Sequence, residues 1–341
     1  MLGEGGDVTD LSDDVSPASA AIPRRARRPS YSAQERRRAA AWKQTSPTLP
    51  AAAREPATYR GAGPTHSFCL PAPYASLSLL PEVRGSALAL FREVRIPWHA
   101  GTTVGPSNHL LSSQVQCVNA LGQMVADPRR IARAFGDYLD IGEILEIEPG
   151  RHLTFEYIGP TDFFGEAPRR ERTRGANCTS VDAAFRHRAP DGAVELVLVE
   201  WKYTESYSTR RSSPHADAVR IRRYGPFLAK PDGPVRNDVI DVEWLLDEPF
   251  YQLARQQLLA HALEVSGAEQ ATRARVVHVS PKANVDYQHS LPRQAHRELG
   301  DTVSEVWQRL LRRPDRFTLV DSSRFLDPTI TSSEYVARYG N

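Results

Sequence analysis

The segment DAAFRHRAPDGAVELVLVEWK, from Asp182 to Lys202, carries the most informative pattern in the sequence. Two strand-like runs, the second of them strongly apolar, flank Ala189-Pro-Asp-Gly192, a combination that favours a tight turn. The pattern therefore predicts an antiparallel β-hairpin with strands at residues 178–188 and 193–205.

The second strand of this hairpin is apolar on both of its sides. Leu196 and Leu198 alternate with Val197, Val199 and Trp201, so apolar side chains point to both faces of the sheet. A strand of this kind is typical of the middle of a sheet that helices cover on both faces. We therefore expect an α/β fold with a buried central sheet.

The ends of the two strands carry acidic and basic residues. If the loop is the three residues 190–192, Asp182 faces Glu200, and Lys202 lies on the same side two residues further on. A two-residue turn would instead put the two acids on opposite faces of the sheet.

Two facing carboxylates are unfavourable unless positive charge lies between them. Lys202 supplies part of that charge, and Mg²⁺, which prefers oxygen ligands, would supply more. The alternative is an ordinary hairpin that ends in a salt bridge at the edge of the sheet.

The segments around the hairpin predict the order of the other elements. Helices are predicted at 85–95, 112–124, 128–139, 249–264 and 294–312, strands at 153–158 and 273–280, and a long basic loop at 209–234. The predicted architecture is a mixed sheet made of a three-strand meander, a helix and a further strand.

The N-terminal part differs in composition from the rest. Residues 1–45 are expected to be disordered or partly helical, with a short basic helix capped by Ser32. Residues 46–84 are rich in Pro, Ala and Gly, so we expect a linker or an arm that lies on the domain. Residues 85–341 are expected to form a single domain.

The composition excludes several classes of protein. The 43 Lys and Arg residues nearly balance the 41 Asp and Glu residues, so any contact with nucleic acid must be local. No apolar run is long enough to cross a membrane, and no charged-then-apolar leader opens the sequence. The 3 cysteines show neither disulfide nor metal-knuckle spacing, so we expect a cytoplasmic protein without membrane contact.

Three phrases carry a family resemblance: LSSQVQCVN (Leu111–Asn119), CTSVDAA (Cys178–Ala184) and EWKYTE (Glu200–Glu205). With Asp182 ahead of Glu200-Trp-Lys202, the chain resembles the PD-(D/E)xK nucleases of the restriction-endonuclease-like superfamily, and the phrases are similar to a bacterial branch of it. The resemblance covers residues 85–285 and implies a restriction-endonuclease-like core. Proline often precedes the aspartate in this family, whereas Val181 stands there in this chain.

The resemblance implies a metal-dependent DNA endonuclease of the restriction or repair type. Asp182 and Glu200 would bind Mg²⁺ (or Mn²⁺) together with the backbone carbonyl of Trp201, and Lys202 would orient the attacking water or stabilise the transition state. Double-stranded DNA is the expected partner, and a homodimer is expected if each chain cuts one strand. Two alternatives stay open: a catalytically idle nuclease fold that binds DNA or organises an assembly, and an RNA-directed nuclease.

Other residues are candidates for the same site. Gln252, Arg255 and Gln256 share one face of a predicted helix, and by analogy with other nuclease branches Gln252 or Gln256 would position the phosphate or the lysine. Glu156 on the first strand, or Gln114 on the earlier helix, would complete the metal site. The alternatives are a solvated helix face and an exposed acid.

Contacts with DNA are expected from arginines in two loops beside the hairpin. The candidates are Arg169, Arg170, Arg172, Arg174, Arg210, Arg211, Arg222 and Arg223. The alternative is a generally arginine-rich surface without a binding role.

Overall fold

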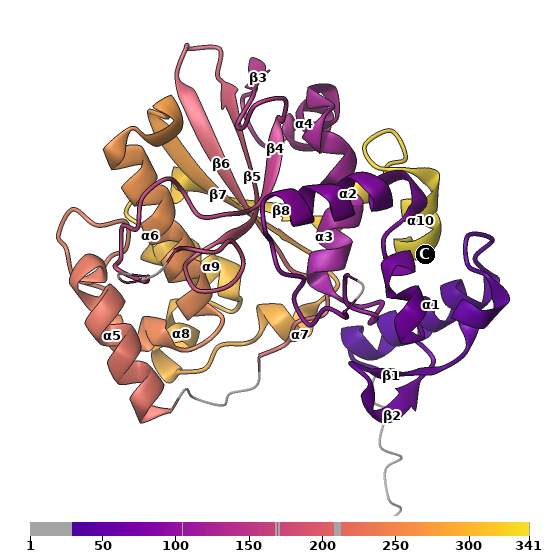
Figure 1. Ribbon diagram of the computed structural model, residues 1–341. Helices are drawn as coiled ribbons and strands as arrows, with labels where there is room; N and C mark the ends of the chain where they lie inside the picture. Colours follow the sequence, from indigo (N-terminus) through magenta and orange to yellow (C-terminus); the bar gives the residue numbers. More distant parts are fainter. Residues whose placement is uncertain (1–28, 104, 168, 170, 208–212, 341) are drawn as a thin grey trace, which may run out of the picture.

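The computed structural model describes residues 29–340 except for 104, 168, 170 and 208–212. Within these residues a mixed β-sheet lies between two layers of helices (Figure 1). The spatial order of the strands is β3-β5-β6-β7-β8, and β4 pairs with β5 next to β3. The strands are β3 (Glu143–Leu145), β4 (Leu153–Tyr157), β5 (Val181–Arg188), β6 (Val194–Trp201), β7 (Arg273–Ser280) and β8 (Phe317–Asp321).

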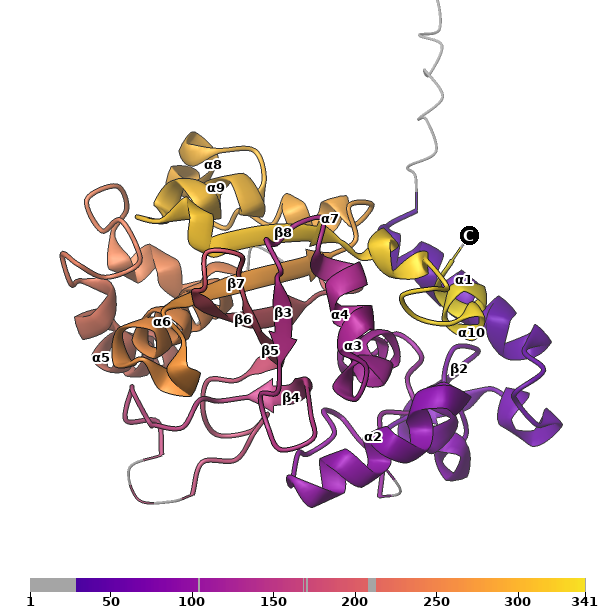
Figure 2. The ribbon, with the colours of Figure 1, turned by 90° about the horizontal axis from the view of Figure 1, so that it is seen from above.

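The helices divide between the two faces of the sheet, as Figure 2 shows. One face carries α5 (Pro214–Leu228), α6 (Phe250–Ser266), α8 (Gln294–Leu299) and α9 (Val303–Leu310). The short helix α7 (Val285–Gln288) packs in the same core cluster. The other face carries α2 (Pro81–Glu93), α3 (Ser113–Leu121) and α4 (Pro128–Phe135), beside α10 (Ser333–Tyr339) and α1 (Tyr31–Thr45). The predicted α/β class, with a mixed sheet flanked by helices, is confirmed. None of the described helices is long and apolar enough to cross a membrane.

The β5–β6 hairpin has the register that the three-residue loop predicts. Ala183 pairs with Val199 and Arg188 with Val194, so the two-residue alternative is excluded. Every residue of β6 is buried. Its apolar side chains divide as predicted: Leu196 and Leu198 pack in the cluster that contains α6, and Val197, Val199 and Trp201 pack in the cluster that contains α3.

The pairing of the strands matches the predicted order of elements. β4, β5 and β6 form an antiparallel meander, whereas β7 runs parallel to β6 and β8 runs parallel to β7. A parallel neighbour needs a crossover connection, and the segment that contains α5 and α6 supplies it between β6 and β7. The carboxyl end of β6 therefore lies beside that of β7 and close to α6.

The N-terminal segment is more ordered than the sequence predicted. The helix α1 begins after Ser30, whose hydroxyl accepts a hydrogen bond from the Ala33 amide, so the predicted cap at Ser32 is wrong and Ser32 lies within the helix. Residues 46–84 contain the hairpin β1 (Ala57–Tyr59)–β2 (Ala62–His66) and two 3₁₀ helices. Leu49, Ala53, Leu70 and Leu79 of this segment are buried in the same core cluster as α2 and α3, which is why it packs on the domain and does not link two parts. The expectation for residues 1–28 lies outside the described part of the chain.

Two predictions about the C-terminal half need correction. The predicted loop at 209–234 contains α5, which Ser213 caps and which Tyr224 and Leu228 anchor in the core. Gly and Pro residues within this helix concealed its periodicity. The single predicted helix at 294–312 is two helices, because the chain is extended at Gly300 and Thr302 then caps α9.

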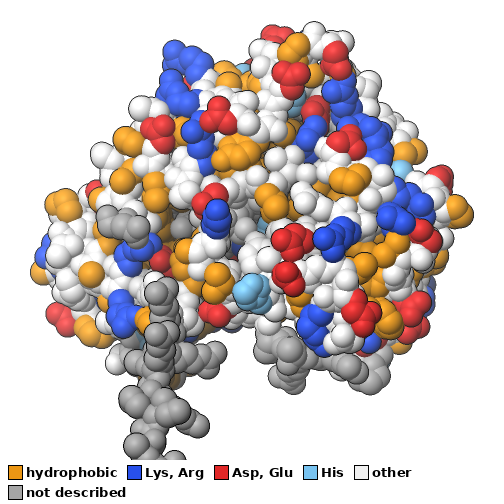
Figure 3. All heavy atoms as spheres, turned by 180° about the vertical axis from the view of Figure 1, so that it is seen from behind, with side chains coloured by type: hydrophobic (Ala, Val, Ile, Leu, Met, Phe, Trp, Pro, Cys, Tyr) orange, Lys and Arg blue, Asp and Glu red, His pale blue; other side chains and the backbone are white. Residues whose placement is uncertain are grey.

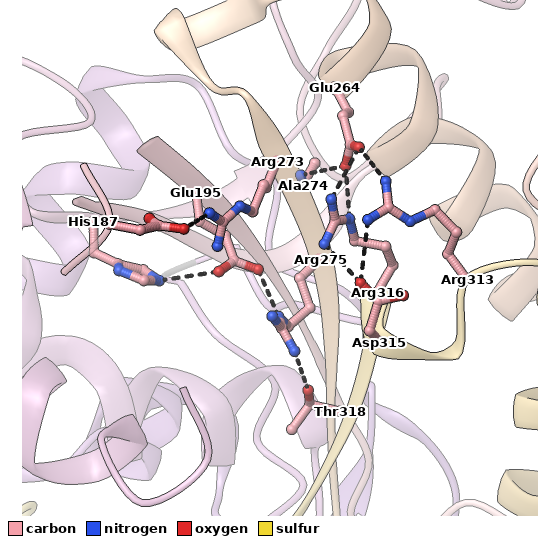
Figure 4. A network of polar contacts seen from close by, with 11 residues as sticks. His187, Glu195, Glu264, Arg273, Ala274, Arg275, Arg313, Asp315, Arg316 and Thr318 are labelled. Atoms are coloured by element: carbon pink, nitrogen blue, oxygen red, sulfur yellow. Dashed lines mark hydrogen bonds and ion pairs between the residues drawn. The ribbon is translucent and has the colours of Figure 1, made fainter. Parts of the chain in front are cut away.

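A polar network holds the end of the sheet that lies away from Glu200 (Figure 4). The buried Glu195 of β6 makes an ion pair with Arg275 of β7 (Nε to Oε1, 2.6 Å) and lies 3.5 Å from the buried ring of His187 in β5. Arg275 also donates a hydrogen bond to the hydroxyl of Thr318 in β8. Ion-pair and hydrogen-bond contacts thereby connect the four neighbouring strands β5, β6, β7 and β8 at this end of the sheet.

Candidate active site

Three carboxylates lie in one row across β4, β5 and β6. The ladder pairs Ala183 with Val199, so the next position places Asp182 opposite Glu200. On the other side of β5, the pairs Phe155–Ala183 and Tyr157–Val181 leave Glu156 beside Asp182. The structure thus brings together the two acids of the hairpin and the acid predicted on the first strand.

Glu200 and Lys202 form a buried ion pair at the end of β6. The Glu200 side chain is 2% exposed and that of Lys202 is 6% exposed, and Lys202 Nζ lies 2.5 Å from Glu200 Oε1. Burial alone would lower the pKa of Lys202, but the Glu200 carboxylate outweighs it and holds this pKa well above its usual value. The ammonium group is therefore charged at neutral pH.

The helix α6 supplies two amides that complete this ion pair. Lys202 Nζ donates to Gln252 Oε1 at 2.6 Å, and Gln256 donates its amide hydrogen to the second oxygen of Glu200. Gln252 and Gln256 are one helical turn apart, so both reach the same end of β6. Of the three residues that the sequence singled out on this helix, the two glutamines therefore contact the lysine and the acid of the hairpin.

Asp182 is held less completely than Glu200. Its Oδ2 accepts a hydrogen bond from the Trp201 amide at 2.7 Å, while its Oδ1 accepts none within the described part of the chain. Burial, the Glu200 carboxylate and the Glu156 carboxylate, in that order, raise the pKa of Asp182 well above its usual value. The site thus has more negative charge than its own cations neutralise.

Glu156 is presented by an unusual backbone conformation. Its φ of 48° lies in the left-handed region, which non-glycine residues seldom adopt within a strand. Its carboxylate accepts hydrogen bonds from Gln114 (2.8 Å) and from the Ser180 hydroxyl (2.9 Å), and burial followed by Glu200 raises its pKa. The carboxylate fits because residue 175 is glycine: a Cβ on Gly175 would lie only 3.0 Å from Glu156 Oε2. Gln114 therefore acts on Glu156, as a hydrogen-bond donor.

These groups open into a cleft of about 710 Å³. Residues of α3, of the three strands, of α6 and of the N-terminal segment line it. Its ionisable lining, apart from histidine, tyrosine and cysteine, consists of the carboxylates Glu156, Asp182, Glu200 and Glu205 and the cations Lys202 and Arg255. The carboxylates outnumber the cations, so a cation is the ligand that this end of the cleft favours electrostatically.

The donor set fits a hard divalent cation. Carboxylate oxygens of Asp182 and Glu200, together with the Trp201 carbonyl, are the ligand types that Mg²⁺ takes, usually with several waters in the remaining positions. The free Oδ1 of Asp182 and the raised pKa of that carboxyl are consistent with such a ligand. Among the described residues no three His, Cys, Asp or Glu side chains are arranged so that they could hold a metal ion together, so the site would rest on two carboxylates and water would supply much of the coordination.

The arginines predicted to contact DNA do not line this cleft where the structure describes them. Arg172 donates to the backbone carbonyls of residues 158, 159 and 161, and Arg174 forms an ion pair with Glu148 at 2.5 Å, so both hold their own loop in place. Arg169 is exposed, and Arg222 and Arg223 lie on α5. Arg170, Arg210 and Arg211 lie outside the described residues. On the face seen in Figure 3, basic side chains are interspersed with acidic ones.

Arg255 is the arginine of α6 that reaches the cleft. Its Nε donates to the Thr179 hydroxyl at 3.0 Å, and its guanidinium lies 3.5 Å from the Glu166 carboxylate. It also lies against the rings of Tyr224 and Tyr251. Arg255 is thus fixed to the wall of the cleft by its own neighbours.

Sequence reasoning assigned no role to Glu205, which the structure places in the same cleft. Its Oε2 accepts a hydrogen bond from the Tyr203 amide at 2.6 Å, and its Oε1 accepts one from the hydroxyl of Ser113 at the start of α3. Tyr207 was also missed, and its hydroxyl donates to Gln252 Oε1 at 3.4 Å. Both follow the strand within a few residues of Lys202, and this closeness in sequence is the signal that points to them.

Comparison with known proteins shows that the chain matches the model of one protein family. The family model described as "Restriction Endonuclease associating with ARP" matches residues 36–340. No curated protein and no solved structure matches the chain.

Proposed function

Since the chain belongs to the family described as restriction endonuclease associating with ARP, we propose that it is a metal-dependent nuclease that hydrolyses phosphodiester bonds of DNA. The observation that carries this proposal is the convergence of Asp182, Glu200 and Lys202 at the end of the β5–β6 hairpin. This convergence supports the proposal, because the resemblance to PD-(D/E)xK nucleases implies two acids and a lysine at one end of such a hairpin, and the mixed sheet flanked by helices is compatible with a restriction-endonuclease-like fold.

Each residue of the site has a role in this proposal. Asp182 and Glu200, with the Trp201 carbonyl, hold Mg²⁺ or Mn²⁺. Such a cation, when bound, lowers the pKa of a bound water and neutralises charge on the phosphate. Lys202, which stays charged beside Glu200, donates to the phosphate oxygens or to the attacking water and stabilises the negative charge that develops in the transition state.

The amides of α6 act by positioning. Gln252 and Gln256 contact Lys202 and Glu200, so they fix the distance between the ammonium and the carboxylates before substrate binds. Glu156, through Gln114 and Ser180, adds a third carboxylate to the cation-binding end of the cleft. Arg255, on the wall of the cleft, is the described arginine best placed to contact a phosphate.

The proposed macromolecular partner is double-stranded DNA. A chain with one such site cuts one strand, so cleavage of both strands would use two copies related by a two-fold axis. A catalytically idle fold would bind DNA without cutting it, and an RNA-directed enzyme would cut only RNA; both are outcomes of the experiment below.

The test is a cleavage assay on plasmid DNA and on RNA with Mg²⁺, with Mn²⁺ and with EDTA. We expect cleavage of DNA only when a metal is present, and we expect Lys202→Ala to lower its rate by about 10²–10³, the usual effect of removing one group that stabilises developing charge. Lys282→Ala is the matched control, because Lys282 is exposed and lies outside the cleft. Equal cleavage by Lys202→Ala and the wild type would refute the assignment.

A further inference from the structure

One wall of the cleft consists of rings and comes from outside the sheet. Tyr59 of β1 and His109, which precedes α3, both line the cleft that holds Asp182 and Glu200. Their rings meet edge to face with centroids 5.1 Å apart, and Phe68 lies edge to face against His109 at 5.0 Å. This aromatic wall, defined as Tyr59 and His109, is a surface that the proposed chemistry does not use. Phe68 lies outside the lining of the cleft, where its ring stacks on His66 and supports His109 from behind.

The aromatic wall is held in place by a buried amide. Asn108 is 1% exposed, and its Nδ2 donates to the carbonyls of Thr58 (2.9 Å) and Leu70 (2.7 Å). The same residue accepts a backbone hydrogen bond from the Leu70 amide at 2.9 Å. Because Thr58 precedes Tyr59 and Asn108 precedes His109, these bonds fix the two rings relative to one another.

The aromatic wall is neutral at physiological pH. Burial, followed by the nearby Arg36 and His66, lowers the pKa of His109 to about 4, so its imidazole carries no charge at pH 7. Tyr59 adds a second uncharged ring. Uncharged flat rings attract other flat π systems, whereas phosphate groups are bound by cations and amides. The aromatic wall is therefore suited to a nucleobase and not to the backbone of DNA.

The size of the cleft points to an unpaired strand. A volume of about 710 Å³ lies within the range of roughly 300–1,000 Å³ that takes drug-sized ligands, which is the scale of a nucleotide. Inside a duplex both faces of a base are covered by its neighbours, so stacking on a protein ring favours an unpaired base, whose faces are free.

We propose that the aromatic wall stacks an unpaired nucleobase beside the phosphate that is cut, so that the strand in the cleft is single-stranded. This inference rests on the proposed nuclease function and specifies the state of its substrate at the cleft: the strand that enters is unpaired, either because double-stranded DNA has opened locally or because the DNA is single-stranded. Tyr59 is then a substrate-binding residue, and Asn108 positions it.

The test measures binding and cleavage separately. Binding is followed by fluorescence anisotropy with EDTA present, using a labelled single strand, the same strand in a blunt duplex, and a single strand with abasic sites. We expect the wild type to bind the single strand at least about tenfold more tightly than the abasic strand or the duplex, in line with roughly 1–3 kcal/mol per stacked base. Equal binding of normal and abasic strands would overturn the inference, and that comparison needs no variant.

Variants then assign the effect to Tyr59. Tyr59→Ala is expected to lose about tenfold in affinity for the single strand, Tyr59→Phe to retain it, and Tyr138→Ala, at an exposed tyrosine outside the cleft, to retain it as well. Unchanged binding by Tyr59→Ala contradicts the proposal. With Mg²⁺ added, cleavage of the duplex as fast as the single strand would overturn this inference but leave the nuclease function intact. Binding of single strands without any cleavage would instead overturn the nuclease function and leave the stacking of an unpaired base intact.

Discussion

Glu156 shows how a single backbone conformation serves the site. A non-glycine residue in the left-handed region costs about 1–3 kcal/mol, so its surroundings must hold it there. Gln114 and Ser180 do so by hydrogen bonds to both carboxylate oxygens. These hydrogen bonds keep the Glu156 carboxylate next to Asp182 in the row of acids.

Gly175→Ala should destabilise the protein more than the backbone strain of an alanine at this positive φ would on its own, because the new methyl group would press on Glu156. The added Cβ would lie 3.0 Å from the Glu156 carboxylate. Gly150→Ala is a matched control, because Gly150 has a similar φ (71° against 67°) but nothing within 4 Å of a Cβ. Thermal unfolding should show a melting temperature several degrees lower for Gly175→Ala than for Gly150→Ala, at roughly 2–4 °C per kcal/mol. Equal shifts for the two variants would mean that the contact with Glu156 is unimportant.

The buried pair of Glu200 and Lys202 predicts a non-additive double mutant. Glu200→Gln leaves a buried ammonium without its carboxylate and should lower the free energy of unfolding by roughly 3–5 kcal/mol. Adding Lys202→Met removes that uncompensated charge, so the double variant should regain much of the loss. Urea unfolding of the two single variants and the double variant measures the coupling. Losses that simply add would show that the two groups do not depend on one another.

At the scale of elements, Glu195 predicts how the strands respond to acid. Burial alone would raise the pKa of Glu195. The neighbouring His187 and Arg275 outweigh burial and lower this pKa to about 2. In the unfolded chain this pKa is about 4.3, so the carboxylate stabilises the fold above that pH, and the contribution is lost as the pH falls towards 2.

Glu195→Gln should therefore be less stable than the wild type at pH 6, and the difference should shrink between pH 4.5 and pH 2. Chemical unfolding followed at several pH values tests this. Glu143→Gln, at an exposed glutamate of the edge strand β3, serves as the control and should track the wild type throughout. A constant difference between Glu195→Gln and the wild type across this range would exclude the ionised carboxylate as its cause.

The hairpin was the most predictable part of the fold. Its turn residues define the loop length, and the loop length defines the register that places Asp182 opposite Glu200. The helix α6 was predictable from its apolar stripe, and the spacing of Gln252 and Gln256 already indicated a shared face. By contrast, β3 has only 3 residues and α5 contains Pro226, so their local patterns do not distinguish them from loops.

The site was predictable only where one segment carries it. Asp182, Glu200 and Lys202 belong to the same hairpin, and their proximity follows from strand geometry alone. Glu156 was a candidate, but its left-handed backbone and the space left by Gly175 depend on how separate loops pack. Likewise, nothing in the sequence brings Tyr59 to the cleft, because that contact depends on a buried Asn108 in a distant segment.

At the scale of the whole molecule, the N-terminal segment is part of the core and forms one wall of the cleft. Lys43 of α1 is fully buried and donates to the carbonyls of Glu55 (2.7 Å) and Cys69 (2.5 Å), which lie at either end of the β1–β2 region. The helix α1 also packs on α10, so the two ends of the described chain lie together (Figure 1).

Lys43→Met should loosen this attachment. The two carbonyls would lose their donor, at a cost of roughly 1–3 kcal/mol for each buried group left unsatisfied. Hydrogen exchange should become faster in residues 57–70 while it stays unchanged in β6. Lys230→Met, at an exposed lysine, is the control. Unaltered exchange in residues 57–70 would show that the segment is held by its apolar contacts alone.

We propose that the acids of the hairpin converge on a point that binds a divalent cation. The most direct measurement is titration of the protein with Mn²⁺, followed by electron paramagnetic resonance, for the wild type, for Asp182→Asn and for Asp286→Asn, an exposed aspartate outside the cleft. The wild type and Asp286→Asn should bind Mn²⁺ alike, and Asp182→Asn should bind it at least about tenfold more weakly, a loss of about 1.4 kcal/mol. Equal binding by all three proteins, or no binding by the wild type, would contradict the account.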